Sequence, residues 1–200
     1  RKEIHPMDVM EFGKVKRIRG ACVSCKISPS SAHRVAYAAR GLFLRLLPDI
    51  WIKTDCHSSS TRKNKMGCGP SPGLSINVVA ETTTGVRLCA EASLDPTAPR
   101  GSELPEDLGQ RVAAMLLEEV RRGGCVDTGV QSLALLMMSL GPEDVSRLRI
   151  GKISKYTIAS LRLFKEAFHV EFKVTPDDET KTILMSCLGS GFTNTARAST

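Results

Sequence analysis

The segment 123–141, GGCVDTGVQSLALLMMSLG, constrains the fold more than any other part of the chain. Two adjacent glycines end a helix that precedes them, and Asp127 is a residue type that forms turns and helix caps. The dense apolar run 133–140 predicts a buried helix. The segment therefore predicts a helix end, a turn and a core helix in close succession.

The hydrophobic pattern before this segment predicts the order strand, helix, strand, strand, strand. These elements are expected at 17–27, 30–47, 50–54, 74–81 and 86–92. Thr84 and Gly85 fit the turn of a hairpin between the last two strands. Residues 56–72 are polar and rich in Gly and Ser, which predicts a loop.

The second half has a different predicted order: helix, helix, strand, helix, strand, strand. The elements are expected at 105–122, 131–140, 147–150, 157–168, 170–174 and 182–188, with an acidic turn at 177–179. The Pro- and Gly-containing stretch 95–101 predicts a boundary between the halves. Strands interspersed with helices indicate an α+β fold, with helices covering one face of each sheet.

Composition narrows the classes of protein to which the chain can belong. With 200 residues, of which 42% are hydrophobic, it has enough apolar material for a buried core. Its net charge of +7 favours polyanionic partners. Seven cysteines, an odd number, predict reduced thiols of the cytosol or nucleus. No apolar run reaches the roughly 18 residues of a membrane span, so a soluble protein with no membrane partner is expected.

Two local motifs are interpreted as structural. Cys22 and Cys25 have CxxC spacing but fall inside a predicted strand, where side chains three apart point to opposite faces. Without a second CxxC or paired histidines, no metal site is expected. The sequence GCGPSPG at 67–73 lacks the terminal Lys-Ser or Lys-Thr of a phosphate loop and opens no helix. No cofactor is therefore expected.

Seven short motifs occur in a fixed order along the chain. They are KRIRG at 16–20, PDI at 48–50, SPGL at 71–74, AETT at 80–83, LPEDLG at 104–109, GGCVD at 123–127 and KYT at 155–157. On these motifs the chain resembles the RNA 3′-terminal phosphate cyclase superfamily, and most closely its cyclase-like branch, which acts in small-subunit ribosome biogenesis. The resemblance spans nearly the whole chain.

The resemblance implies an architecture that periodicity alone does not give. Family members have a large domain of repeated units similar to the carboxy-terminal domain of translation initiation factor 3, with a smaller thioredoxin-like α/β domain inserted. On that basis 1–14 ends a preceding repeat unit, 15–99 is the inserted domain, and 100–200 is the last unit. The chain begins with Arg1 rather than Met, and we expect an amino-terminal half of the same protein as its intramolecular partner.

The resemblance also implies an altered active site. In the cyclases a histidine attacks ATP and carries the adenylyl group, and Tyr156 stands at the matching position. A phenol with a pKa of about 10 must lose its proton before it attacks, whereas a neutral imidazole is already a nucleophile near pH 7. Gln131, followed by Ser132, stands where cyclases carry Asp-Gln, so an amide replaces a carboxylate. We therefore expect no catalytic residue and no cyclase activity.

The histidines of the chain are not expected to replace the missing nucleophile. His5 and His169 stand at the edges of predicted segments, His33 lies on the first predicted helix, and His57 falls in the polar loop. A surface or packing role is expected for each.

Clustered basic residues are candidates for RNA binding. They comprise Lys16, Arg17 and Arg19 near the start, Arg62, Lys63 and Lys65 in the polar loop, and Arg162 and Lys165 on the helix that follows Tyr156. Such side chains can neutralise phosphates. Aromatic residues make up only 4% of the chain, which leaves few stacking surfaces for bases. A solvated charged edge therefore remains an equal alternative.

The resemblance implies a non-catalytic assembly factor of the small-subunit processome. Its implied role is 18S rRNA maturation in the nucleolus, with a nucleolar GTPase and the pre-ribosomal particle as partners and direct pre-rRNA contact left open. The alternative is an RNA-processing enzyme, either a pre-rRNA endonuclease or an ATP-dependent 3′-end cyclase. An endonuclease would have to use Tyr156, Arg162 and Lys165, which supply neither a clear general base nor a metal-binding carboxylate pair.

Overall fold

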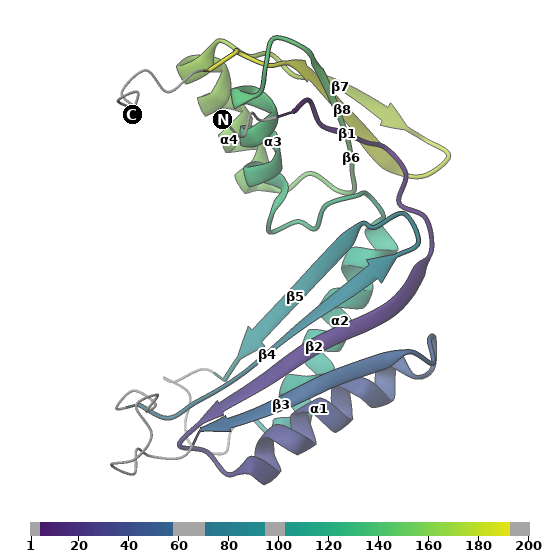
Figure 1. Ribbon diagram of the computed structural model, residues 1–200, viewed down its shortest axis with the longest axis vertical. Coiled ribbons are helices and arrows are strands. Elements are labelled where there is room, and N and C mark those ends of the chain that lie inside the picture. The colour runs from purple at the N-terminus through teal and green to yellow at the C-terminus, as the bar shows by residue number, and fades with distance from the viewer. Residues whose placement is uncertain (1–4, 58–70, 95–102, 193–200) are drawn as a thin grey trace, which may run out of the picture. The chain divides into compact units, whose positions relative to one another are not determined.

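The computed structural model describes residues 5–57, 71–94 and 103–192 (Figure 1). Backbone contacts group the chain into two compact units. One, called here the continuous unit, is Gly13–Arg121, and the other, the split unit, combines Arg1–Phe12 with Arg122–Thr200. Among the described residues, no helix has both the length and the apolar character needed to cross a membrane.

The continuous unit contains a four-stranded sheet in the order β3-β2-β4-β5 (Figure 1). Its strands are β2 Val15–Cys25, β3 Ile50–His57, β4 Gly73–Thr82 and β5 Arg87–Ser93. β3 runs parallel to β2, whereas β4 is antiparallel to both β2 and β5. The helices are α1 Pro29–Phe43 and α2 Pro105–Arg122.

Alternation of side chains along the strands gives this sheet one apolar face. Ile18 and Cys22 of β2 are buried, as are Ile76 and Val78 of β4, because residues two apart share a face of a strand. The helices contribute a complementary apolar surface. Their buried residues include Val35, Ala39 and Phe43 of α1 and Leu108, Val112 and Leu116 of α2.

Gly109 allows the two helices of the continuous unit to pack closely. A Cβ atom at this position would overlap the carbonyl oxygen of Val35 and lie 3.0 Å from the Cβ of Ala38. Only a residue without a side chain fits so near another helix backbone. The LPEDLG motif at 104–109 thus contributes to the joint between α1 and α2.

The split unit contains a second four-stranded sheet, in the order β1-β6-β8-β7. The strands are β1 Asp8–Val9, β6 Val145–Ile150, β7 Lys173–Asp177 and β8 Thr182–Leu188. β1 pairs parallel with β6, and β8 is antiparallel to β6 and β7. The helices α3 Gln131–Leu140 and α4 Lys155–Phe168 contact each other, and α3 contacts β8. The core includes Leu135, Met138, Leu148, Phe164 and Met185.

The predicted order of elements is confirmed, and helices 105–122 and 131–140 match the structure at both ends. The α+β class is confirmed at this level. Several predicted bounds are wrong, among them those of β2, which lies at 15–25 instead of 17–27, and the start of β6, which is Val145 instead of 147. α1 ends at Phe43 because the chain turns at 44–46, β3 continues to His57, α4 begins at Lys155, and β7 lies at 173–177 instead of 170–174. β1 was not predicted, since two residues carry no periodicity.

Contact clustering divides the chain at a different place from the domain boundary expected at 99–100. That position lies outside the described residues, but the helix that follows it, α2, groups with the continuous unit as far as Arg121. The physical reason is the burial of Leu108, Val112 and Leu116, which line up on the helix face that packs in this unit. The division therefore falls at Arg121–Arg122.

Candidate functional site

The two positions expected to mark a degenerate active site both lie in the split unit. Gln131 is the first residue of α3, and its side chain is buried with 1% exposure. Tyr156 lies in the first turn of α4, and its ring is 71% exposed. The structure thus places both at helix amino termini, with opposite exposure to solvent.

Gln131 uses both ends of its side-chain amide. Its Nε2 donates a hydrogen bond of 3.1 Å to the carbonyl oxygen of Lys152, and its Oε1 accepts one of 2.9 Å from the Oγ1 of Thr157. A carboxylate at the same place has no N–H to donate, so it would leave the Lys152 carbonyl unsatisfied. The amide that replaces the expected aspartate therefore has a definite structural function.

Thr157 connects this amide to the cap of α4. Its backbone nitrogen donates a hydrogen bond of 3.0 Å to the Oγ of Ser154, the residue that caps the helix. A further bond of 3.2 Å runs from the Oγ of Ser160 to the Oγ of Ser132. The first turns of α3 and α4 are therefore held together by polar contacts, which sequence reasoning had not identified beyond Gln131.

The loop before α3 fixes the position of Gln131. The carboxylate of Asp127 accepts hydrogen bonds of 3.1 Å from the backbone nitrogens of Gly129 and Val130, which turns the chain into the helix. The backbone nitrogen of Cys125 donates to the carbonyl of Arg149 at 2.7 Å. Gly124 has φ +91°, and a Cβ there would overlap the backbone of Gly151. The GGCVD motif therefore packs against the end of β6, through the backbone of Gly124 and Cys125.

Tyr156 is oriented outward from this network. Within the part of the chain that the structure describes, its hydroxyl makes no hydrogen bond, while its carbonyl accepts one of 3.0 Å from Ser160 Oγ. No three His, Cys, Asp or Glu side chains among the described residues are arranged to hold a metal ion. The geometry offers an exposed phenol at the start of α4, with no hydrogen-bonded base among the described residues to activate it.

The basic candidates on β2 are engaged in ion pairs. Lys16 Nζ lies 3.3 Å from the carboxylate of Glu81, and Arg17 Nε lies 2.7 Å from it. The hydrogen bond from Arg17, assisted by that from Lys16, lowers the pKa of Glu81 to about 2. Arg19 pairs with Asp49 at 2.8 Å. Much of the positive charge predicted to meet RNA is therefore compensated within the sheet.

The remaining basic candidates that the structure describes, Arg162 and Lys165, lie on α4. Lys165 Nζ forms an ion pair of 2.8 Å with Glu171, and Arg162 is exposed on α4, six residues after Tyr156. The predicted loop cluster of Arg62, Lys63 and Lys65 lies outside the described residues. The structure thus brings Tyr156, Arg162 and Lys165 onto one helix, and places Lys16, Arg17 and Arg19 in the other unit.

The histidines and thiols occupy structural positions. His33 is exposed on α1, and His169 ends α4 in the left-handed conformation. His57 lies on β3, not in the loop as predicted, with its Nε2 3.4 Å from Asp55. No disulfide joins any two of the six described cysteines, and both cysteines of the CxxC sequence lie on β2, as predicted. Burial raises the pKa of the Cys22 thiol to about 11, which keeps it protonated near pH 7.

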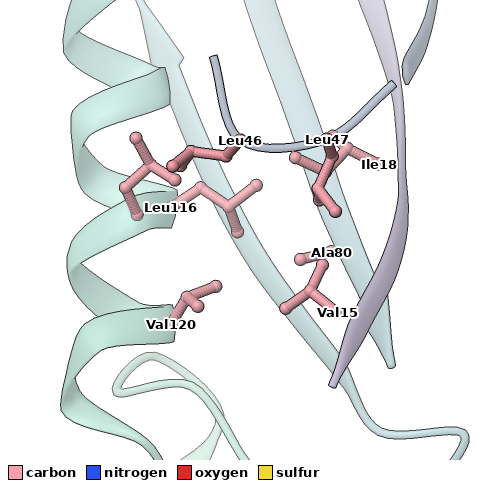
Figure 2. Close-up of a pocket in the computed structure, with 8 residues that line it drawn as sticks. Val15, Ile18, Leu46, Leu47, Ala80, Leu116 and Val120 are labelled. Atoms are coloured by element: carbon pink, nitrogen blue, oxygen red, sulfur yellow. The ribbon is translucent and has the colours of Figure 1, made fainter. Parts of the chain in front are cut away.

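The continuous unit contains a partly open apolar pocket of about 180 Å³ (Figure 2). Figure 2 shows Leu116 and Val120 of α2 facing Val15, Ile18 and Ala80 of the sheet. Leu46 and Leu47, from the connection between α1 and β3, lie at one side. Because every lining side chain is aliphatic, the pocket provides no group that would bind a nucleotide or perform acid–base chemistry.

Comparison with known proteins assigns the family. Residues 10–121 match the insert domain of the RNA 3′-terminal phosphate cyclases. This range agrees with the continuous unit, including α2. The chain is 42% identical over 203 residues to the RNA 3′-terminal phosphate cyclase-like protein of Homo sapiens, covering 98% of the chain and 53% of the relative.

Two further relatives extend the comparison. A probable RNA 3′-terminal phosphate cyclase-like protein of Dictyostelium discoideum is 43% identical, over 96% of the chain and 53% of the relative. The rRNA processing protein rcl1 of Schizosaccharomyces pombe is 37% identical, over 98% and 52%. The chain spans about half the length of these curated relatives. It belongs to the RNA 3′-terminal phosphate cyclase family, among the members that carry the name cyclase-like protein.

Proposed function

We propose that the chain is part of a non-catalytic factor in rRNA processing. The observation that carries this proposal is the state of the two altered positions. Gln131 donates a hydrogen bond to Lys152 and accepts one from Thr157, and these bonds hold α3 to the start of α4. Tyr156 is an exposed phenol at the position where a cyclase needs a histidine. The retained frame supports binding, while the missing nucleophile argues against adenylyl transfer.

The role in ribosome assembly is inferred from the relatives. A protein of Schizosaccharomyces pombe that matches 98% of the chain is named an rRNA processing protein. We infer a function in the small-subunit processome during 18S rRNA maturation, in the nucleolus. The proposed partners are a nucleolar GTPase, the pre-ribosomal particle and the amino-terminal half of the same protein.

The architecture proposed for the two units follows the family. The continuous unit has the order β-α-β-β-β-α with β2 and β3 parallel, which fits the expected thioredoxin-like inserted domain. The split unit has two helices on a four-stranded sheet, which fits a repeat similar to the carboxy-terminal domain of translation initiation factor 3. Both assignments concern fold, and neither carries an activity by itself.

The first experiment tests for the covalent step. The full-length protein that contains this chain is incubated with ATP labelled on the α-phosphate, beside an active cyclase as positive control. We expect no labelled protein, because no histidine stands at position 156. A stable adduct on the wild-type protein would refute the non-catalytic assignment.

The second experiment addresses the endonuclease alternative. Purified protein is incubated with precursor rRNA, and the same assay is run on Arg162→Ala/Lys165→Ala. We expect no specific cleavage by either protein, since Lys165 is paired with Glu171 and the Tyr156 hydroxyl has no bonded base among the described residues. Specific cleavage that the double substitution abolishes would establish the nuclease instead.

A further inference from the structure

A long stretch of the chain carries positive charge without any acidic residue. Residues 12–48 contain eight Lys and Arg and no Asp or Glu. The whole chain has 28 basic and 21 acidic residues, so this stretch alone accounts for a large share of the excess positive charge. This stretch comprises β2, α1 and the connections around them.

The structure divides these cations into paired and unpaired groups. Lys16 and Arg17 are held by Glu81, and Arg19 by Asp49. On α1, Arg34 forms a two-pronged pair with Glu106, at 2.5 and 2.7 Å. Two arginines at the end of this stretch, Arg40 and Arg45, are exposed and have no ion pair with a described residue.

Arg40 shares a face of α1 with an exposed aromatic ring, and Arg45 lies in the turn 44–46 that follows the helix. His33, Tyr37, Arg40 and Leu44 recur at helical spacing on the side opposite the buried Val35, Ala36, Ala39 and Phe43. Tyr37 is 81% exposed. We call His33, Tyr37, Arg40, Leu44 and Arg45 the α1 surface.

Gly41 keeps this surface open. It stands four residues after Tyr37 on the helix and four residues before Arg45, which lies in the turn that follows α1. A Cβ at Gly41 would meet nothing within 4 Å, so packing does not explain the glycine. Position 41 therefore places no side chain between the exposed Tyr37 and the exposed Arg45.

Helix stability explains only part of this arrangement. Arginines near a helix carboxyl end interact favourably with the helix dipole, which accounts for Arg40. The dipole gives no reason to expose an aromatic ring in mid-helix. Uncompensated guanidinium groups beside an open ring provide the two elements that bind unpaired nucleotides, namely phosphate neutralisation and base stacking.

We propose that the α1 surface binds single-stranded RNA, with Arg40 and Arg45 on phosphates and Tyr37 stacked on an unpaired base. An acidic protein segment would also attract the arginines. A protein side chain, however, anchors best in a pocket, whereas a base stacks on a flat ring that is open on both sides. The exposure of Tyr37 favours RNA. The choice of RNA as the ligand rests on the proposed function, whereas the charge of the α1 surface and the exposure of Tyr37 are observed in the structure.

The experiment measures binding of the 200-residue chain to a fluorescently labelled, mixed-sequence single-stranded RNA by anisotropy over a salt series. Arg40→Gln/Arg45→Gln is compared with Lys53→Gln/Arg87→Gln, which removes the same charge from exposed strand positions of the same unit. We expect the α1 pair to weaken binding at least tenfold at 0.1 M salt. Its slope of log K against log salt should become shallower by about 1.4, for two lost phosphate contacts.

Tyr37 provides an independent test of stacking. Tyr37→Ala should weaken RNA binding about tenfold without changing the salt slope, while Tyr37→Phe should bind like the wild type. Thermal unfolding of every variant verifies that the fold is retained, as expected for exposed positions.

Several results would overturn the proposal. They are absence of RNA binding by the wild-type chain, equal losses in the two charge-matched pairs, an unaffected Tyr37→Ala variant, and equal affinity for a polyglutamate peptide. Equal affinity for duplex RNA would also exclude stacking on an unpaired base. A labelled adenylate in the earlier assay would refute the proposed function but leave this binding result intact, so the two failures are distinguishable.

Discussion

The Oγ1 of Thr157 donates a hydrogen bond of 2.9 Å to the Oε1 of Gln131, across a separation of 26 residues. Both side chains are buried, with 0% and 1% exposure. This contact ties the start of α4 to the start of α3, and the same amide donates through Nε2 to the carbonyl of Lys152, which a carboxylate could not do. The residue that departs from the cyclase pattern is therefore integrated into the core.

We predict that Gln131→Glu is destabilising in a pH-dependent manner. At pH 7 it should lower the free energy of unfolding by about 3 kcal/mol, because it buries a charge and removes the donor to Lys152. Burial raises the pKa of such a carboxyl group in the folded state, so the loss should be smallest near pH 4 and grow as pH rises.

Urea unfolding at pH 4 and pH 7 measures this effect. Gln110→Glu is the matched control, since Gln110 is exposed on α2 and the same substitution there should cost less than about 0.5 kcal/mol. A loss at position 131 that is equal at both pH values would show that charge burial is not the cause.

We predict that Gly124→Ala is more costly than Gly85→Ala. Both glycines have positive φ, +91° and +88°, so both substitutions strain the backbone by about 1 kcal/mol. A Cβ at Gly85 meets nothing within 4 Å, whereas one at Gly124 overlaps the backbone of Ile150 and Gly151. The loss at Gly124 should therefore reach about 3 kcal/mol in chemical denaturation. Equal losses would mean that the loop moves away freely.

Arg149 and Asp177 should make the split unit sensitive to acid. Arg149 donates to Asp177 Oδ2 at 2.6 Å, to Thr182 Oγ1 at 2.9 Å and to the carbonyl of Met10 at 2.8 Å. The hydrogen bond from Arg149, with others from Thr180 and Glu179, lowers the pKa of Asp177 to about 2. The folded state therefore favours the carboxylate, whose stabilising effect is present above the ordinary pKa near 3.8.

As pH falls from about 4 to 2, this contribution should disappear. The measurement is the difference in free energy of unfolding between the wild type and Asp177→Asn, followed from pH 6 to pH 2. The two proteins should converge in acid. A difference that stays constant over this range would contradict the assignment.

We predict that Tyr156→His neither destabilises the chain nor restores chemistry. The ring is 71% exposed, so the free energy of unfolding should change by less than about 0.5 kcal/mol. Labelled ATP should still give no adduct, because Gln131 remains an amide engaged with Lys152 and Thr157. Thr157→Val, one residue away but buried, should cost about 2 kcal/mol. An adduct on Tyr156→His would show that the rest of the site is still competent.

The sequence was sufficient to predict those helices and strands whose formation depends on local hydrophobic patterns. The run 131–140 and the amphipathic pattern 105–122 predicted α3 and α2, respectively, at their observed bounds. β1 was beyond such reasoning, because Asp8 pairs with Arg147 and nothing within two residues signals that partner. The full length of β3 was missed because its last residues are held by pairing with β2 as far as Cys25 and His57, which the local sequence does not show.

The candidate site divides in the same way. The family resemblance identified Gln131 and Tyr156, but not the hydrogen bond to Thr157, which requires the folded loop. The basic residues of β2 were predicted as an RNA contact from their clustering. Their neutralisation by Glu81 depends on strand register, since Arg17 and Glu81 are opposite each other although 64 residues apart in the chain. A cluster of charged residues in the sequence therefore does not reveal the oppositely charged partners that lie on neighbouring strands of the folded sheet.

The interrupted connectivity of the split unit has a consequence for biosynthesis. Met7, whose backbone nitrogen donates to Ser146 Oγ, is separated from that acceptor by 139 positions, and the whole of Gly13–Arg121 is translated in between. On the ribosome the continuous unit is therefore synthesised first, and it can fold before β6, β7 and β8 of the split unit have been made. β1 therefore cannot form its ladder with β6 until β6 has emerged.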